Sequence, residues 1–160
     1  MNEPIKILVV EDDPAIALDI KVILTKSGYM VLGPTHNYKN ALDFLENYNV
    51  DLALLDINID GEKSGIDLAH HINEVYHIPF IFLTSYADQR TITEAADTLP
   101  ATYIVKPFKE QDLFPAIKIA LINKLRAKER SIRSLSSLNK GLLLKLTKTE
   151  YEIILLICNG

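Results

Sequence analysis

The chain has 160 residues, of which 48% are hydrophobic, and its formal net charge is −4. This length suits one compact domain with a short extension, and the apolar content is high enough to exclude wholesale disorder. The net charge is too small to indicate a nucleic-acid-binding surface over the whole molecule.

Short apolar runs alternate with longer amphipathic segments five times along the chain. The apolar runs are mostly aliphatic, as expected of strands that are buried on both faces. We predict strands at residues 5–10, 29–33, 51–56, 78–84 and 102–106. The first helix is predicted to start at Pro14, with Asp13 as its N-cap, and to end before Gly28. Further helices are predicted at residues 38–48, 65–75, 88–98 and 110 to about 127.

This alternation predicts the fold class. Strands that alternate with helices over short loops indicate parallel strands joined by right-handed crossovers. Five such units predict an α/β protein with three layers, α/β/α, in which helices cover both faces of a doubly wound, five-stranded parallel sheet. We expect residues 1–127 to form this domain.

The end of the chain has a different composition. Residues 128–146 include the polar stretch SIRSLSSLNK and are predicted to be a linker. Residues 147–160 predict a new amphipathic helix, in which Thr147 and Glu150 have the spacing of a capping box. A single helix cannot bury its own apolar face. We therefore expect residues 147–160 to be the truncated start of a further domain.

A basic run lies near this junction. Five lysines and arginines fall between positions 124 and 133, against the single acid Glu129. Two explanations are open: contact with DNA or another anionic partner, and a solvated helix end whose cations complement the helix dipole. The sequence alone favours the second.

Cys158 is the only cysteine, which excludes an internal disulfide and is typical of a reducing, cytoplasmic location. The apolar residues around it favour a small core residue over a nucleophile. The N-terminus lacks the pattern of a signal peptide, and no apolar run approaches the roughly 18 residues needed to span a bilayer.

Polar side chains stand at or just after the C-terminal ends of four predicted strands. In an open parallel sheet these ends meet at one edge, which is where ligands bind. Singly, each residue has an ordinary structural explanation, such as a helix N-cap or a solvated lysine, but their joint placement indicates a site. The residues are Glu11, Asp12 and Asp13 after the first strand, Asp56 on the third, Thr84 and Ser85 at the fourth, and Lys106 on the fifth.

The residue types indicate phosphoryl transfer to a carboxylate. Carboxylates held close together repel each other and favour a divalent cation, and an all-oxygen set of ligands suits Mg²⁺. One carboxylate can then attack phosphorus and form an acyl phosphate. A lysine and a hydroxyl group would stabilise the charge on the phosphoryl oxygens.

Four segments carry a resemblance to a known family: ILVVEDDP, LALLDINIDGEKSGIDLA, IPFIFLTSYAD and YIVKPF. In order and spacing they resemble the signature blocks of the response regulator receiver (CheY-like) family of two-component signalling, over about residues 4–125. The resemblance implies a flavodoxin-like fold with strand order 2-1-3-4-5. It also implies a signalling domain rather than an enzyme, phosphorylated by a sensor histidine kinase or a phosphotransfer protein.

The resemblance implies a role for each acidic position. Asp56 matches the phosphoacceptor. Glu11 and Asp12 match the acidic pair that binds Mg²⁺ together with Asp56, and the backbone carbonyl of Asn58 would be a further ligand. Asp13 matches no position of the site and remains a helix N-cap.

The other matching positions belong to the fourth and fifth strands. Thr84 matches the hydroxyl that binds the phosphoryl group, and Lys106 matches the lysine of the family's KP motif. Pro107 is expected to follow a cis peptide bond. Thr84 and Tyr103 match the pair whose movement accompanies phosphorylation.

The resemblance also suggests a homodimer that forms on phosphorylation. Its surface would lie within residues 88–122, and Leu99, Phe114 and Ile117 are candidate contacts. Core packing is the favoured explanation for Ile117.

The last fifteen residues resemble the opening helix of a LuxR-type helix-turn-helix domain. OmpR-type winged-helix domains begin a helix in a similar way, but the stretch ATYIVKPFKEQDLFPAIKIAL lacks the acidic and arginine residues of their dimer face, so the LuxR type is favoured. Either type implies a transcription factor that reads DNA only through its full-length effector domain.

Two other functions use similar residues. A Mg²⁺-dependent phosphatase needs a second acid near Asp56, usually two residues on, but Asn58 stands there. A flavin-binding module needs a hydroxyl- and glycine-rich phosphate loop after the first strand, where EDDPA would repel a phosphate. Both are therefore disfavoured.

Overall fold

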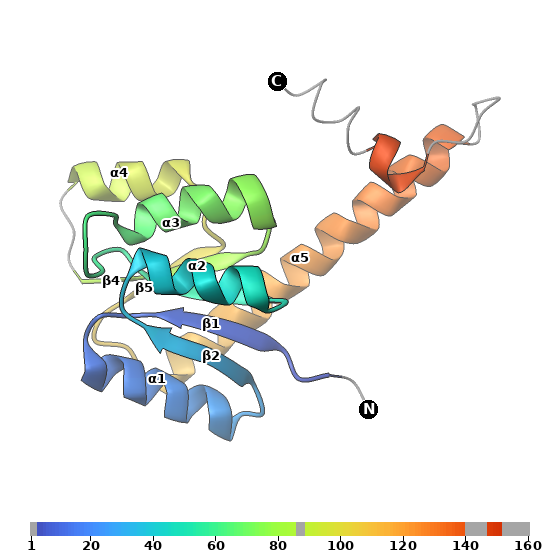
Figure 1. Cartoon of the computed structure of the whole chain (residues 1–160). Coiled ribbons are helices and arrows are strands. Elements are labelled where there is room, and N and C mark those ends of the chain that lie inside the picture. Colours follow the sequence, from blue (N-terminus) through green and yellow to red (C-terminus); the bar gives the residue numbers. More distant parts are fainter. Residues whose placement is uncertain (1–2, 86–88, 140–146, 152–160) are drawn as a thin grey trace. The chain divides into compact units, whose positions relative to one another are not determined.

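The computed structural model describes residues 3–85, 89–139 and 147–151 of the chain. Within these residues, five strands form one parallel sheet with the order β2-β1-β3-β4-β5 (Figure 1). The strands are β1 (Lys6–Val10), β2 (Met30–Thr35), β3 (Leu52–Asp56), β4 (Phe80–Thr84) and β5 (Thr102–Val105). Both the predicted fold class and the predicted strand order are confirmed.

The first helix starts where the sequence places its cap. Asp13 accepts hydrogen bonds from the N–H groups of Ala15 and Ile16, and Pro14 is the first residue of α1. The third predicted helix continues as a short π-helix, which ends where His77 adopts a left-handed conformation. The helices are α1 (Pro14–Lys26), α2 (Tyr38–Asn47), α3 (Gly65–His71), the π-helix η1 (Ile72–Tyr76), α4 (Gln89–Asp97) and α5 (Glu110–Asn139).

Helices cover both faces of the sheet and enclose two apolar cores (Figure 1). Alternate residues of β1 point to opposite faces, so that Leu8 belongs to one core and Ile7 to the other. Helices α2, α3 and α4 contribute to the core that contains Leu8, and α1 and the first part of α5 contribute to the second. This burial on both faces explains the continuous apolar runs of the strands.

Strand β2 is longer than predicted, because it continues through Gly33 and Pro34. Gly33 has a φ of +87°, and a Cβ atom there would lie 3.0 Å from the carbonyl oxygen of Val9. The register with β1 shifts at this point, and β2 is an edge strand, which tolerates a proline. As a result, the carbonyl of Thr35 accepts a hydrogen bond of 2.8 Å from the N–H of Glu11.

The prediction that the last helix ends near Ala127 is wrong, because α5 continues to Asn139. Residues 128–139 contain neither glycine nor proline, so nothing in them ends a helix, and this part of the predicted linker is helical. The chain divides into two compact units, residues 1–121 and 122–160.

The capping box predicted after the linker is present. Glu150 accepts hydrogen bonds from the N–H and the hydroxyl of Thr147, whose hydroxyl oxygen accepts one from the N–H of Glu150. The rest of the predicted effector helix, residues 152–160, lies outside the described residues. None of the helices in the described part of the chain is long and apolar enough to cross a membrane.

Candidate functional site

Three carboxylates meet beyond the C-terminal ends of β1 and β3. One oxygen atom from each of Glu11, Asp12 and Asp56 lies within 4.8 Å of the other two. Glu11 and Asp56 are buried, whereas Asp12 is exposed. Parallel strands end at the same edge of a sheet, which is why acids that are far apart in the sequence meet here.

Lys106 brings a positive charge to these acids from the end of β5. Its Nζ atom lies 2.5 Å from Oδ2 of Asp56 and 2.6 Å from Oε2 of Glu11, and it donates a hydrogen bond of 2.8 Å to Oε1 of Glu11. The Lys106–Pro107 peptide bond that follows is cis. The structure therefore brings Glu11, Asp12, Asp56 and Lys106 together.

Burial and neighbouring charges shift the pKa values of Glu11 and Lys106. Burial raises the pKa of Glu11 to about 7, and Asp56 adds to the rise while the hydrogen bond from Lys106 opposes it. Burial also acts to lower the pKa of Lys106, but its hydrogen bonds to Asp56 and Glu11 outweigh this and raise the pKa above the ordinary value. Lys106 is thus held in its charged form between the two buried acids.

Backbone N–H groups orient the acids further. Oδ1 of Asp56 accepts a hydrogen bond from the N–H of Asn58 at 3.1 Å, and Oε1 of Glu11 accepts one from the N–H of Asp13 at 3.3 Å. The chain thus wraps around the carboxylate of Asp56 immediately after β3.

The donor set fits a magnesium ion. Oε2 of Glu11 is buried, and the ammonium group of Lys106 pairs with it at 2.6 Å. Three carboxylates that offer only oxygen atoms, one of them facing water, match the preference of Mg²⁺.

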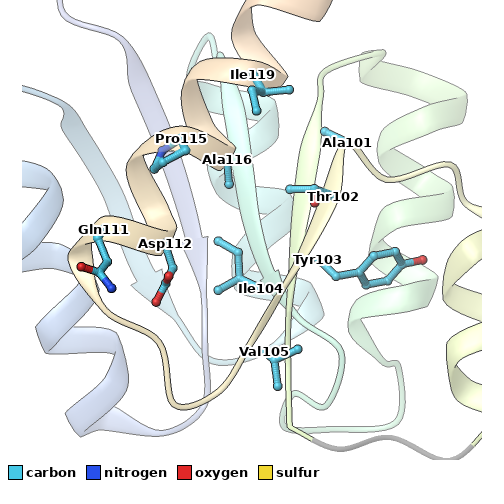
Figure 2. Close-up of a pocket in the computed structure, with 10 residues that line it drawn as sticks. All are labelled: Ala101, Thr102, Tyr103, Ile104, Val105, Gln111, Asp112, Pro115, Ala116 and Ile119. Carbon is cyan, nitrogen blue, oxygen red and sulfur yellow. The ribbon is translucent and has the colours of Figure 1, made fainter.

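Among the described residues, Thr84 and Tyr103, the predicted switch pair, form no side-chain hydrogen bond with the acids. The hydroxyl of Thr84 donates a hydrogen bond of 2.6 Å to the carbonyl of Ser85, and among the described residues it makes none to Asp56 or Lys106. The ring of Tyr103 stacks on Phe82 at 5.8 Å and points away from α5 (Figure 2). Their predicted movement stays a prediction.

Gly65, at the start of α3, is a site residue that sequence reasoning missed. A Cβ atom at this position would lie 1.8 Å from the carbonyl oxygen of Asp56, and the N–H of Gly65 donates a hydrogen bond of 2.9 Å to the carbonyl of Ile57. Only glycine lets α3 approach the end of β3 so closely. The sequence offered a weak signal, a glycine directly after the N-cap Ser64.

A shallow hollow of about 630 Å³ runs along the outer edge of β5 (Figure 2). One wall is β5 with the residue before it, and the other is the start of α5. Among its lining residues, Val105 and Ile119 are apolar and exposed. Of the predicted dimer contacts, Leu99 is 84% exposed, whereas Ile117 is fully buried in the core.

Comparison with known proteins places this chain in a family. Residues 7–118 match the family model of the response regulator receiver domain. The chain is 30% identical over 135 residues to the transcriptional regulatory protein PdtaR of Mycobacterium tuberculosis, covering 83% of this chain and 65% of that protein. It is 32% identical over 169 residues to YrkP of Bacillus subtilis, an uncharacterized transcriptional regulatory protein, covering 96% of this chain and 72% of that one.

Solved structures agree with this match. The receiver domain of a modulated diguanylate cyclase from Desulfovibrio desulfuricans superposes with a TM-score of 0.74 at 30% identity, covering 78% of this chain and 99% of that one. A CheY-like receiver domain protein from Methanospirillum hungatei gives a TM-score of 0.72 at 28% identity, with the same coverage. The resemblance seen in the sequence is confirmed.

Proposed function

The chain belongs to the response regulator receiver family, and from this premise we propose that Asp56 accepts a phosphoryl group from a histidine kinase or a phosphotransfer protein. The observation that carries the proposal is the ion pair between Lys106 and Asp56, beside the acidic cluster and at the carboxyl edge of the sheet. Asp56 is the acid that both contacts Lys106 and stands at the end of β3.

The chemistry follows from the two oxygens of Asp56. One carboxylate oxygen forms a bond to phosphorus while the bond from phosphorus to the nitrogen of the donor histidine breaks. The N–H of Asn58 already holds Oδ1, and Lys106 lies beside Oδ2. After transfer, the ammonium group of Lys106 is positioned to pair with an oxygen of the phosphoryl group, and the Thr84 hydroxyl would bind another once it turns from Ser85.

Magnesium is the proposed cofactor. Glu11, Asp12 and Asp56 would hold the ion, with the backbone carbonyl of Asn58 as a further ligand. The bound ion would neutralise negative charge on the acids and on the phosphoryl oxygens.

We also propose a transcriptional output. PdtaR and YrkP are named as transcriptional regulatory proteins, and this chain spans about two thirds of the length of PdtaR. The receiver domain would lie within residues 1–127, the connection within 128–146, and an effector domain would begin near Thr147. The capping box at Thr147 and Glu150 supports a helix start there.

Phosphorylation of an Asp56→Asn variant tests the assignment. Incubation with acetyl phosphate and Mg²⁺ should add one phosphoryl group to the wild-type chain, measured by mass spectrometry, and none to the variant, because an amide oxygen is a poor nucleophile. Asp13→Asn is the matched control, because it removes a neighbouring acid while asparagine still caps α1. Full labelling of Asp56→Asn, or loss of labelling in Asp13→Asn, would contradict the proposal.

A further inference from the structure

The extended part of α5 carries cations that the phosphorylation site does not use. Five lie between positions 124 and 133. Because α5 continues to Asn139, they lie in the middle of the helix, and its last turn contains no basic residue. The dipole explanation that the sequence favoured therefore fails, since the helix dipole acts on charged side chains only in the first and last turns.

Three of these cations form one face of the helix, which we call the arginine face: Arg126, Arg130 and Arg133. Their spacing of four and three residues puts them side by side along α5. All three are exposed, and none takes part in an ion pair between described residues. Like charges at these spacings repel each other, and Glu129, three residues after Arg126 and four before Arg133, offsets part of this repulsion.

The two compact units differ strongly in charge. Residues 1–121 contain nine lysines and arginines against eighteen acids, a net charge of −9, whereas residues 122–160 contain eight against three, a net charge of +5. The modest charge of the whole chain hides this contrast. A strongly basic segment next to an acidic domain is typical of a chain that binds a polyanion.

We propose that the arginine face binds the phosphate backbone of double-stranded DNA without reading its sequence. At about 1.5 Å per residue the face is about 10 Å long, which matches about three intervals between successive phosphates along the axis of one strand. Arginine suits this contact because its planar guanidinium group binds phosphate through two parallel hydrogen bonds. The contact is independent of phosphorylation at Asp56 and of any sequence-reading helix beyond it.

DNA is favoured over an anionic membrane surface by the neighbouring face of α5. Exposed Ile122, Leu125 and Ile132 follow one another at spacings of three and seven residues, as on a membrane-binding helix. However, the acid Glu129 falls between them on the same face, and a carboxylate there opposes insertion into the apolar layer of a membrane. The names of the similar transcriptional regulators agree with this choice.

The test is the salt dependence of binding to a mixed-sequence DNA duplex, measured by fluorescence anisotropy. Replacing Arg126, Arg130 and Arg133 by glutamine should make the slope of log K against log salt shallower by about 2.7, because three phosphate contacts are lost. The ratio of the wild-type DNA affinity to that of the glutamine variant should then fall about 40-fold as salt rises from about 50 to 200 mM. The matched control replaces Lys21, Lys26 and Lys39, exposed cations of the acidic unit, by glutamine and should leave the slope unchanged.

Two further measurements separate binding from folding. Urea denaturation should show the glutamine variant to be about as stable as wild type, because the three substituted side chains are exposed. A triple arginine-to-lysine variant should keep the wild-type slope. The proposal is overturned if the glutamine variant keeps the wild-type slope. It is overturned equally if the slope of the lysine control becomes as shallow as that of the glutamine variant. It is also overturned if phosphatidylserine vesicles bind the wild-type chain as tightly as DNA and lose binding in the glutamine variant.

Discussion

Lys106 is the cation that both buried acids of the site share. Its ammonium group lies within 2.6 Å of carboxylate oxygens of both Glu11 and Asp56. Two buried carboxylates without a counter-charge would repel each other, so this lysine stabilises the edge of the sheet. A divalent cation that binds the same oxygens must compete with it.

We therefore predict opposite effects of two substitutions on Mg²⁺ affinity. Lys106→Met should tighten Mg²⁺ binding by a few-fold, because the competing positive charge is lost, and should weaken the response to phosphorylation. Asp12→Asn should weaken binding at least tenfold, because a carboxylate ligand is lost. Isothermal titration calorimetry measures both, and an equal loss of affinity in the two variants would contradict this division of roles.

The acids and the lysine could be predicted from the sequence, because each follows directly from the end of a strand. Gly65 could not, since its importance comes from the 1.8 Å approach that a Cβ would make to a carbonyl oxygen on another element. The contacts of Thr84 and Tyr103 could not either. Their roles depend on side-chain rotamers, which strand position leaves open.

At the scale of elements, the start of α3 is fixed by a reciprocal cap. The N–H and hydroxyl of Ser64 donate hydrogen bonds to Asp67, and the N–H of Asp67 donates one back to the hydroxyl oxygen of Ser64. These bonds from Ser64 hold the pKa of Asp67 below its ordinary value. Because Gly65 follows directly, this cap also sets how α3 meets Asp56.

The cap should make part of the stability depend on pH. A carboxylate whose pKa is depressed in the folded state stabilises the protein above its unfolded pKa, and this contribution is lost as pH falls through the folded pKa. Asp67→Asn should therefore cost about 0.3 to 1 kcal/mol at neutral pH, a difference that shrinks at about pH 3. Urea denaturation at both pH values tests this. The control is Asp43→Asn, because Asp43 is an exposed aspartate within α2. A difference from wild type that does not change with pH would refute the role of the charge.

Element boundaries were predicted well where a local signal marks them. The capping residues of α1 illustrate this, because Asp13 and Pro14 act within one turn. The end of β2 was missed because the strand was predicted to stop at Gly33, whereas pairing with β1 carries it through Pro34 to Thr35. The end of α5 was missed because serine-rich composition suggested a linker, although no residue there breaks a helix.

At the scale of the whole molecule, an apolar surface along β5 remains open to a partner. The hollow beside this edge strand is flanked by Val105 and Ile119, each more than half exposed (Figure 2). Exposed apolar groups that cluster around a groove mark an interaction surface more often than scattered ones do. Tyr103 lies on the same strand, so a change in its position would alter this surface.

We predict that phosphorylation drives dimerisation through this surface. Beryllofluoride with Mg²⁺, which mimics the phosphoryl group, should raise the mass in sedimentation velocity from monomer toward dimer. Val105→Lys and Ile119→Lys should each keep the chain monomeric, because burying an unpaired ammonium in the interface is costly. Leu18→Lys is the matched control, since Leu18 is a similarly exposed apolar residue on α1 and should leave the dimer intact. A wild-type chain that has the same mass with and without beryllofluoride, or a Leu18→Lys variant as defective as the other two, would show that this surface does not control assembly.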